Sequence, residues 1–279
     1  MSGIFEQTIQ ILATAGIESP RLEARLMLAA ACGCTAAEIF SDITLKAPQK
    51  RLLNSLIKQR LQHKPLDKIL GHRAFYKSDF AVSEDVLSPR PDTEILVEEA
   101  LNLISDKAVN ILDLGTGSGC IIESILLENK SAHGTAVDIS AASLQIAERN
   151  AVNLKVANRL EFIQADWFDA DFMQHFTATF DLIVSNPPYI PTADIALLAP
   201  EVKDHDPLYA LDGGSDGLSS YRRIAEIAPM LLNSHGYVLL EAGINQAQPI
   251  VDIFQNAGFK HCNTVADLGG IERCIVMRR

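Results

Sequence analysis

The sequence contains no long uninterrupted apolar run. Its apolar runs are short, and those over residues 121–122 and 125–127, for example, are ended by Glu123 and Glu128. They fall far short of the roughly 20 residues that span a bilayer as a helix. The segment MSGIFEQTIQILATAG at the start lacks the basic residues and the small-residue cleavage site of a signal peptide. These absences predict a cytoplasmic protein that does not associate with membranes.

Cysteine is scarce, and its spacing excludes two classes of small scaffold. The chain of 279 residues has five cysteines, which are odd in number, scattered and never arranged as C-x-x-C: Cys32, Cys34, Cys120, Cys262 and Cys274. This pattern argues against a disulfide framework and against a structural zinc site. We expect free thiols and no bound metal.

Positive charge is scarce in most of the chain. The formal net charge is -11. Residues 1–85 carry 11 basic and 9 acidic side chains, whereas the remainder carries 13 basic and 26 acidic ones. Because a surface that grips a nucleic-acid backbone is usually basic, this balance argues against a stable nucleic-acid partner without excluding one.

Hydrophobic residues make up 48% of the chain, enough for a sizeable core. Residues 1–72 have apolar residues at helical spacing and no catalytic constellation, which predicts a helical domain for substrate recognition or support. Its helices are expected over residues 5–13, 20–33, 35–40 and 48–63. Residues 74–86 read as a short hairpin, and we expect residues 73–90 to link this domain to the next.

Residues 91–279 alternate between strand and helix patterns. After a helix over 92–103, strands are expected at 109–114, 134–139, 160–164, 180–185 and 236–241, and a closing pair at 260–266 and 273–277. Helices are expected at 121–127, 141–153, 221–232 and 246–257, and a polar loop from residue 200. This alternation predicts an α/β fold with a mostly parallel, seven-stranded sheet covered by helices on both faces.

A glycine-rich turn follows the first of these strands. Its sequence is Asp113-Leu114-Gly115-Thr116-Gly117-Ser118-Gly119. Three glycines allow backbone N–H groups to approach a ligand closely, and the carboxyl edge of a parallel sheet is the usual binding crevice. The spacing G-x-G-x-G differs from the dinucleotide pattern, and there is no G-x-x-x-x-G-K-[ST] loop, which argues against an ATPase.

Acidic residues also end the next two strands. Asp138 is placed to accept hydrogen bonds from both hydroxyls of a ribose, Asp166 to reach an adenine amino group, and Trp167 to offer an aromatic face. Alone, each has a plainer reading, as a helix cap, a solvated strand tip or a core aromatic. In this order and spacing they resemble the class I methyltransferase fold. That resemblance implies S-adenosylmethionine as cofactor, bound by Gly115, Thr116, Gly117, Ser118, Gly119, Asp138, Asp166, Trp167 and Asn186.

The motif Asn186-Pro187-Pro188-Tyr189 directly follows the strand over 180–185. An amide or aromatic amino nitrogen is a poor nucleophile because its lone pair is delocalised. The Asn186 Oδ1 atom and the Pro187 carbonyl can accept both of its hydrogens and turn the lone pair toward a methyl donor, while Tyr189 offers a flat apolar ring. We therefore predict Asn186, Pro187 and Tyr189 as catalytic, and all four residues as substrate-binding. The plainer reading is a turn that ends a strand.

The motif occurs in two classes of enzyme, the adenine-amino DNA methyltransferases and the glutamine methyltransferases of peptide chain release factors. Further segments resemble the second class: Phe75-Tyr76, Phe80, Leu87 to Glu94, Glu201-Val202, Asp206 to Gly214, Asp216 to Leu218, Leu240-Glu241 and Asp267-Leu268. With the helical region they cover nearly the whole chain. The resemblance implies methylation of the glutamine in the Gly-Gly-Gln motif of release factors by a monomer. Methylation of an adenine or guanine amino group in DNA or RNA remains the alternative.

Overall fold

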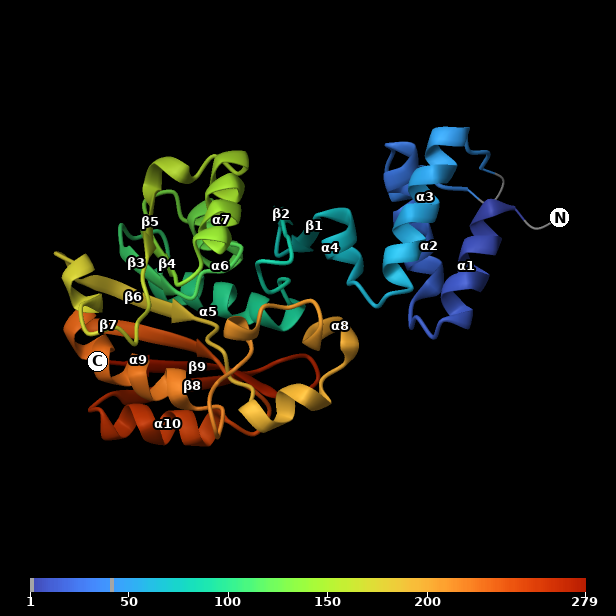
Figure 1. Cartoon of the computed structure of the whole chain (residues 1–279). Coiled ribbons are helices and arrows are strands. Elements are labelled where there is room, and N and C mark those ends of the chain that lie inside the picture. The colour runs from blue at the N-terminus through green and yellow to red at the C-terminus, as the bar shows by residue number, and fades with distance from the viewer. Residues whose placement is uncertain (1–2, 41–42) are drawn as a thin grey trace. The chain divides into compact units, whose positions relative to one another are not determined.

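The computed structural model describes residues 3–40 and 43–279 (Figure 1). The chain forms two compact units. The first consists of Met1–Gly71 together with the distant segment Ala199–His205, and the second of His72–Leu198 together with Asp206–Arg279. Each unit has its own hydrophobic core.

The first unit is helical, as predicted. Its elements are α1 (Ile4–Thr14), α2 (Pro20–Cys32), α3 (Ala47–Arg60), α4 (Leu66–Leu70) and, from the distant segment, α8 (Pro200–Lys203). Pro20 opens α2, where its missing N–H costs nothing, and Gly33 ends it in the left-handed conformation. The helix expected over residues 35–40 is a single 3-10 turn, Ala36–Glu38, because Glu38 accepts hydrogen bonds from the Thr35 N–H and hydroxyl and closes the turn.

Arg60 ties the distant segment into the helical unit. Its side chain is almost fully buried, with Nε 2.6 Å from Glu23 Oε2 and Nη2 2.6 Å from Glu201 Oε1. Lys68 Nζ donates to the backbone oxygen of His205 at 2.6 Å. The residues from 200 onward, expected as a plain polar loop, therefore begin with a short helix that belongs to the first unit.

The second unit contains the predicted seven-stranded sheet. Its strands are β3 (Asn110–Leu114), β4 (His133–Asp138), β5 (Leu160–Gln164), β6 (Phe180–Ser185), β7 (Leu232–Glu241), β8 (Lys260–Ala266) and β9 (Glu272–Arg278). Their order is β5-β4-β3-β6-β7-β9-β8, and β9 runs antiparallel to both of its neighbours. The predicted fold class is thus confirmed, and β5 and β6 have the predicted bounds.

Helices cover both faces of this sheet (Figure 1). On one face lie α5 (Glu94–Ile104), α6 (Cys120–Glu128) and α7 (Ala141–Asn153), and on the other lie α9 (Ser219–Leu231) and α10 (Ala247–Asn256). Successive strand residues join opposite cores, because side chains alternate along a strand. Leu182 and Val184 pack toward the α5–α6 side, and Ile183 between them packs toward α9 and α10.

The predicted hairpin is formed by β1 (His72–Phe75) and β2 (Ser78–Ala81). Phe75 and Phe80 are buried in the same core as α5 and α6 and meet edge to face, with ring centroids 6.0 Å apart. Asn150 on α7 fixes the end of β2 by bonding both the N–H and the oxygen of Ala81. The hairpin is therefore an integral part of the second unit. The domain ranges 1–72, 73–90 and 91–279 stay a prediction.

Two further findings concern the described ranges only. Within residues 3–40 and 43–279, no helix is long and apolar enough to cross a membrane. Within the same ranges, histidine, cysteine, aspartate and glutamate side chains do not gather in groups of three or more that could hold a metal ion.

Candidate active site

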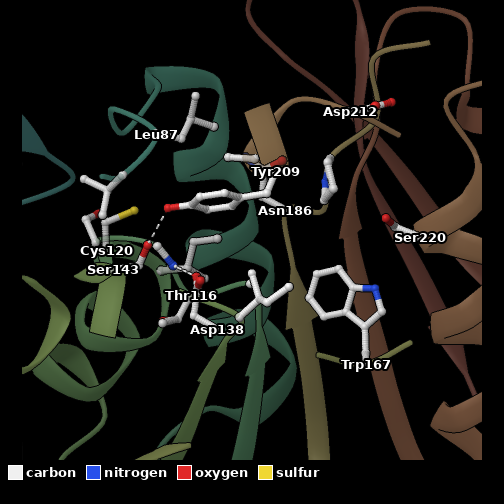
Figure 2. A pocket seen from close by; sticks show the side chains of 18 of the residues that line it. Leu87, Thr116, Cys120, Asp138, Ser143, Trp167, Asn186, Tyr209, Asp212 and Ser220 are labelled. Atoms are coloured by element: carbon white, nitrogen blue, oxygen red, sulfur yellow. Dashed lines mark hydrogen bonds between the residues drawn. The ribbon is translucent and has the colours of Figure 1, made fainter. Parts of the chain in front are cut away.

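The site lies where the strand order reverses direction. From β3 the chain proceeds to β4 and β5, whereas β6 and β7 lie on its other side. In sheets of this kind the crevice at such a switch point, beyond the carboxyl ends of the strands, is where ligands bind. The glycine-rich turn follows β3, and Asn186 follows β6. A cavity of about 390 Å³ opens between them (Figure 2), within the usual range for small-molecule sites.

Most of the predicted site residues line this one cavity. They are Gly115, Thr116, Gly117, Ser118, Asp138, Asp166, Trp167, Asn186 and Pro188. Gly119, Pro187 and Tyr189 were also predicted, but they are not among the lining residues. Gly119 lies at the start of α6, the Pro187 ring is buried, and Tyr189 packs against the core beneath α9 and α10.

The glycine-rich turn needs its glycines for conformation and for space. Gly115, Gly117 and Gly119 all have positive φ, between 54° and 81°, which other residues adopt only at a cost. A Cβ atom on Gly115 would lie 3.3 Å from the Trp167 ring, and one on Gly119 would lie 2.0 Å from Glu123 Oε1. The turn is therefore pressed against its neighbours on two sides.

The N–H groups of this turn are bonded within the protein, which corrects one expectation. Gly115 and Thr116 both donate to the Val137 oxygen, Gly117 donates to Asp138 Oδ2, and Gly119 donates to the Thr116 oxygen. These four N–H groups are thus not available to a ligand. The turn instead leaves open space above Gly117.

Asp138 ends β4 and faces the cavity. Its Oδ2 accepts from the Gly117 N–H and its Oδ1 from the Ser140 N–H, each at 2.9 Å. Burial raises the pKa of this carboxyl, and the backbone hydrogen bonds oppose that rise. A carboxylate has about four acceptor positions, so Asp138 can still accept from two ribose hydroxyls.

Asp166 and Trp167 follow β5 at the same edge. Asp166 Oδ1 accepts from the Phe168 N–H at 2.8 Å, which shapes the turn. Trp167 contributes both to the cavity wall and to the adjoining core, and its buried indole Nε1 has no hydrogen-bond partner among the described residues. Trp167 therefore belongs to the wall of the cavity and to the core at once, and its contact with a cofactor stays a prediction.

The polar groups of the cavity suit S-adenosylmethionine better than a phosphate ligand. The lining includes three carboxylates, those of Asp138, Asp166 and Asp212, while the N–H groups of the glycine turn are occupied. Acceptors and negative charge match a ligand that carries a sulfonium, an ammonium group and a ribose diol. They would repel the phosphates that a helix N-terminus or glycine loop normally binds through free N–H groups.

Asn186 is held at the carboxyl end of β6 by contacts on both sides. Before it, Ser185 Oγ donates to the Leu114 oxygen at 2.6 Å and fastens β6 to the end of β3. The Asn186 Nδ2 atom donates to Thr93 Oγ1 at 3.4 Å. After it in the chain, the backbone oxygen of Tyr189 accepts from Gln246 Nε2 at 2.9 Å. Burial raises the pKa of the Tyr189 phenol to about 12, so it stays protonated at neutral pH.

The segment 212–218 packs closely against the backbone of this motif. The Gly213 N–H donates to the Ile190 oxygen, and the Ile190 N–H donates to the Leu211 oxygen. A Cβ atom on Gly213 would lie 2.8 Å from the Tyr189 Cα atom, and one on Gly217 would lie 2.3 Å from the Tyr189 oxygen. The glycines that carry the family resemblance in this segment thus have a physical role, because any side chain would push the motif away.

Several site residues escaped prediction as individual residues. Tyr209 lies across the cavity (Figure 2). Its hydroxyl donates to the backbone oxygen of Asp85 at 2.6 Å and lies 3.2 Å from Ser143 Oγ. Arg90, which also lines the cavity, forms an ion pair with Asp206, with Nη2 3.4 Å from Oδ2. Thr93, which is almost fully buried, lines the cavity beside Asn186, and Glu241 is buried behind Thr93. For Tyr209, Thr93 and Glu241 the only signal in the sequence was membership of segments that resemble the family.

Two buried acids lie beneath the cofactor turn. Asp113 is the next-to-last residue of β3, and its Oδ2 accepts from the Thr116 hydroxyl at 2.7 Å; burial raises its pKa to about 7. Glu123 on α6 is fully buried, and neither of its carboxyl oxygens has a hydrogen-bond partner among the described residues. Burial, and then the nearby Asp113, raise the pKa of Glu123 well above its ordinary value. Its apolar surroundings therefore favour the protonated form of Glu123 over the ionised form.

Comparisons with known families match both units. The family described as "PrmC N-terminal domain" matches residues 4–71, and the family described as "Methyltransferase domain" matches residues 105–248. The second match covers more than half of the chain and includes the glycine-rich turn, Asp138, Trp167 and Asn186.

Two curated relatives extend over nearly the whole chain. A release factor glutamine methyltransferase from Rhodospirillum rubrum is 42% identical over 96% of this chain and 82% of its own length. One from Caulobacter vibrioides is 40% identical over 95% of this chain and 91% of its own. Among solved structures, a methyltransferase from Pyrococcus furiosus superposes with a TM-score of 0.53 at 16% identity, over 72% of this chain and 88% of that one. At that identity the structural likeness bears on the fold alone.

Proposed function

The chain belongs to the release factor glutamine methyltransferase family, and from this premise we propose that it transfers a methyl group from S-adenosylmethionine to the side-chain amide nitrogen of the glutamine in the Gly-Gly-Gln motif of peptide chain release factors. The observation that carries the proposal is the position of Asn186. It lies at the carboxyl end of β6, on the wall of the cavity that also contains the glycine-rich turn. A methyl acceptor held by Asn186 would thus lie next to the methyl donor.

The cofactor supplies a methyl group on a positively charged sulfur. We assign its binding to the turn 115–119, to Asp138 for the ribose, to Asp166 and Trp167 for the adenine, and to Asn186 near the methionine part. The carboxylates in the lining support a cationic ligand, and the Asp138 carboxyl is fixed by its two backbone hydrogen bonds. That rigidity reduces the entropy lost when the ribose is bound.

At the acceptor end, Asn186 Oδ1 and the Pro187 oxygen accept the two hydrogens of the glutamine amide. Binding both hydrogens orients the nitrogen lone pair toward the methyl group. As the S–CH₃ bond of the bound donor broke and the C–N bond formed, with the neutral thioether as leaving group, the nitrogen would become more acidic and these hydrogen bonds would strengthen, so they would stabilise the transition state more than the bound substrate. The proton leaves after transfer, and Pro188 and Tyr189 limit where the amide can lie.

We assign recognition of the release factor to the helical unit, and we expect the enzyme to act as a cytoplasmic monomer without a metal ion or a stable nucleic-acid partner. The segment Ala199–His205 connects the helical unit in sequence to the part of the chain that carries the catalytic motif. It follows the catalytic motif in the chain, and Arg60 and Lys68 hold it in the helical unit.

The test is a methylation assay with a mapped product. The purified protein is incubated with S-adenosylmethionine and unmethylated release factor, and the peptide containing Gly-Gly-Gln is analysed by mass spectrometry. We expect one added methyl group on that glutamine, and none on a release factor in which the glutamine is replaced by alanine.

One outcome of this assay would contradict the proposed substrate. If the release factor gains no methyl group while duplex DNA or RNA becomes methylated on an adenine or guanine amino group, the substrate assignment is wrong. No finding in the comparisons favours that alternative.

A further inference from the structure

Behind Asn186 lies a buried chain of hydrogen bonds that the reaction described above does not use directly. Glu241, the last residue of β7, and Thr93, in the turn before α5, are each 2% exposed. The Thr93 hydroxyl donates to Glu241 Oε2 at 2.6 Å, and Asn186 Nδ2 lies 3.4 Å from Thr93 Oγ1. Against the rise that burial causes, the Asn186 side chain also lowers the pKa of Glu241 by hydrogen bonding, so three residues that are far apart in the sequence form one cluster that includes the catalytic amide.

The direction of these hydrogen bonds follows from the chemistry of the groups. An ionised carboxylate only accepts, and a threonine hydroxyl has a single hydrogen to donate. Because Thr93 gives that hydrogen to Glu241, it can only accept from Asn186. The NH₂ group of Asn186 must therefore face Thr93, which leaves Oδ1 as the side of the amide turned away from this chain of bonds.

We propose that Glu241, acting through Thr93, is a positioning residue that fixes which end of the Asn186 amide is presented to the glutamine substrate. The inference rests on the proposed function, because a flipped amide would offer an NH₂ group to the substrate NH₂ and repel it. Asn186 alone has no means of choosing between the two orientations, since its oxygen and nitrogen ends have nearly the same shape.

The surroundings of Glu241 also fix its carboxyl group in place. The Tyr221 hydroxyl donates to the Glu241 backbone oxygen at 2.7 Å. Burial raises the pKa of the Glu241 carboxyl to about 7, and this rise is opposed by the Thr93 hydrogen bond and then by Arg273, whose Nη1 donates to the Ala242 backbone oxygen at 3.3 Å. The bond from Asn186 to Thr93 is longer than the usual 2.7–3.2 Å, so it is the weakest part of the chain and the part most easily lost on mutation.

The decisive variants are Thr93→Val and Thr93→Ser. Valine keeps the branched shape but removes the hydroxyl, whereas serine keeps the hydroxyl. We expect Thr93→Val to lower kcat by roughly tenfold, the size of a lost hydrogen bond to a charged network. The KM for the release factor and the affinity for S-adenosylmethionine should stay unchanged. Thr93→Ser should recover most of kcat, and Thr177→Val, at an exposed threonine outside the cavity lining, is the matched control.

A second measurement does not depend on turnover. Hydrogen exchange of the Asn186 side-chain NH₂ group, followed by ¹⁵N NMR in the whole protein, should be slow in the wild type. It should be several-fold faster in Thr93→Val and in Glu241→Gln, because a glutamine can turn either end of its amide toward Thr93. The Glu241→Gln variant has nearly the same shape as the wild type and serves where Thr93→Val fails to fold.

The outcomes separate the two proposals. If the wild type methylates the release factor and both Thr93→Val and Glu241→Gln match it in kcat and in exchange, the positioning role is wrong while the function stands. If the wild type transfers no methyl group to the release factor, the proposed function is wrong, and the exchange measurement still decides whether Glu241 and Thr93 orient Asn186.

Discussion

The two ends of the cavity are built on different principles. The cofactor end is made of local features, a glycine-rich turn and two carboxyl groups, one at the end of β4 and one shortly after β5. The acceptor end depends on contacts between distant parts of the chain, because Asn186 is supported by Thr93 from the turn before α5 and indirectly by Glu241 from β7. The cofactor end thus depends on a rigid backbone to bind S-adenosylmethionine. The acceptor end depends on the orientation of one side chain, that of Asn186, to bind the methyl acceptor.

This difference predicts that separate residues determine the binding of S-adenosylmethionine and the rate of methyl transfer. Changes at the cofactor end should appear in the affinity for S-adenosylmethionine. Changes at the acceptor end should appear in kcat, since the hydrogen bonds of Asn186 strengthen only as the methyl group is transferred.

The largest effect is expected for Asn186→Ala. The variant removes the Oδ1 acceptor, and we expect kcat to fall by about a hundredfold or more, the cost of one lost transition-state hydrogen bond in a buried site. Cofactor affinity, measured by calorimetry, should stay close to that of the wild type. Asn256→Ala, at an exposed position at the end of α10, is the matched control. Turnover like that of the wild type in Asn186→Ala would refute the assigned role.

Asp138→Ala should show the opposite pattern. It removes the acceptors proposed for the ribose and also releases the Gly117 N–H, so we expect affinity for S-adenosylmethionine to fall by roughly tenfold to a hundredfold. At saturating cofactor, kcat should recover to within a few-fold of the wild type. Asp106→Ala, at an exposed residue before β3 and outside the cavity lining, controls for the loss of charge. Unchanged cofactor affinity in Asp138→Ala would argue against the ribose assignment.

The acceptor end should also depend on pH through Glu241. Burial raises the pKa of this carboxyl to about 7, although the Thr93 hydrogen bond and Arg273 favour ionisation. Only the ionised form fixes the direction of the hydrogen bonds, so kcat should rise with pH up to about 7, by at most about tenfold per unit, and then level off. The other titratable groups that interact with this carboxyl are those of Asp92, Arg273, Tyr189, Tyr221, Cys120 and Cys274.

The control for this pH profile is Glu241→Gln, which has no carboxyl to titrate. It should lose the rise in kcat on the acidic side. A profile of kcat that is the same in wild type and Glu241→Gln would show that another group causes the rise.

The smallest effect concerns stability beneath the cofactor turn. The pKa of Glu123 is raised in the folded protein, so between its ordinary value of 4.5 and the raised value the folded state holds a proton that the unfolded state has lost. Stability therefore falls as pH rises through this range, by up to about 1.4 kcal/mol per unit. Glu123→Gln, which has no such proton, should be more stable than the wild type at pH 8 and nearly equal to it at pH 4.

Chemical denaturation at the two pH values measures this difference. Glu148→Gln, at an exposed residue on α7, should change stability little at either pH. An advantage of Glu123→Gln that does not grow with pH would mean that Glu123 ionises in the folded protein at an ordinary pH.

Sequence reasoning predicted the cofactor end better than the acceptor end, for a physical reason. Strand periodicity and the glycine-rich turn are local signals, so the strands, their carboxyl edge and the positions of Gly115, Asp138 and Asn186 could be predicted. The hydrogen bonds from the Gly115 and Thr116 N–H groups to the Val137 backbone oxygen could not be predicted, because they depend on the pairing of β3 with β4. Glu241 and Thr93 were equally hidden, since 148 residues separate them and only the fold brings them together.

The measurement that tests the central claim most directly compares two variants in two assays. Binding of S-adenosylmethionine by calorimetry and methyl transfer to the release factor glutamine at saturating cofactor are measured for Asn186→Ala and Asp138→Ala. We predict that Asn186→Ala binds the cofactor normally and transfers almost no methyl group, while Asp138→Ala binds weakly and still transfers it. If both variants lose affinity and turnover in parallel, the two ends of the cavity do not have separate roles, and this account is wrong.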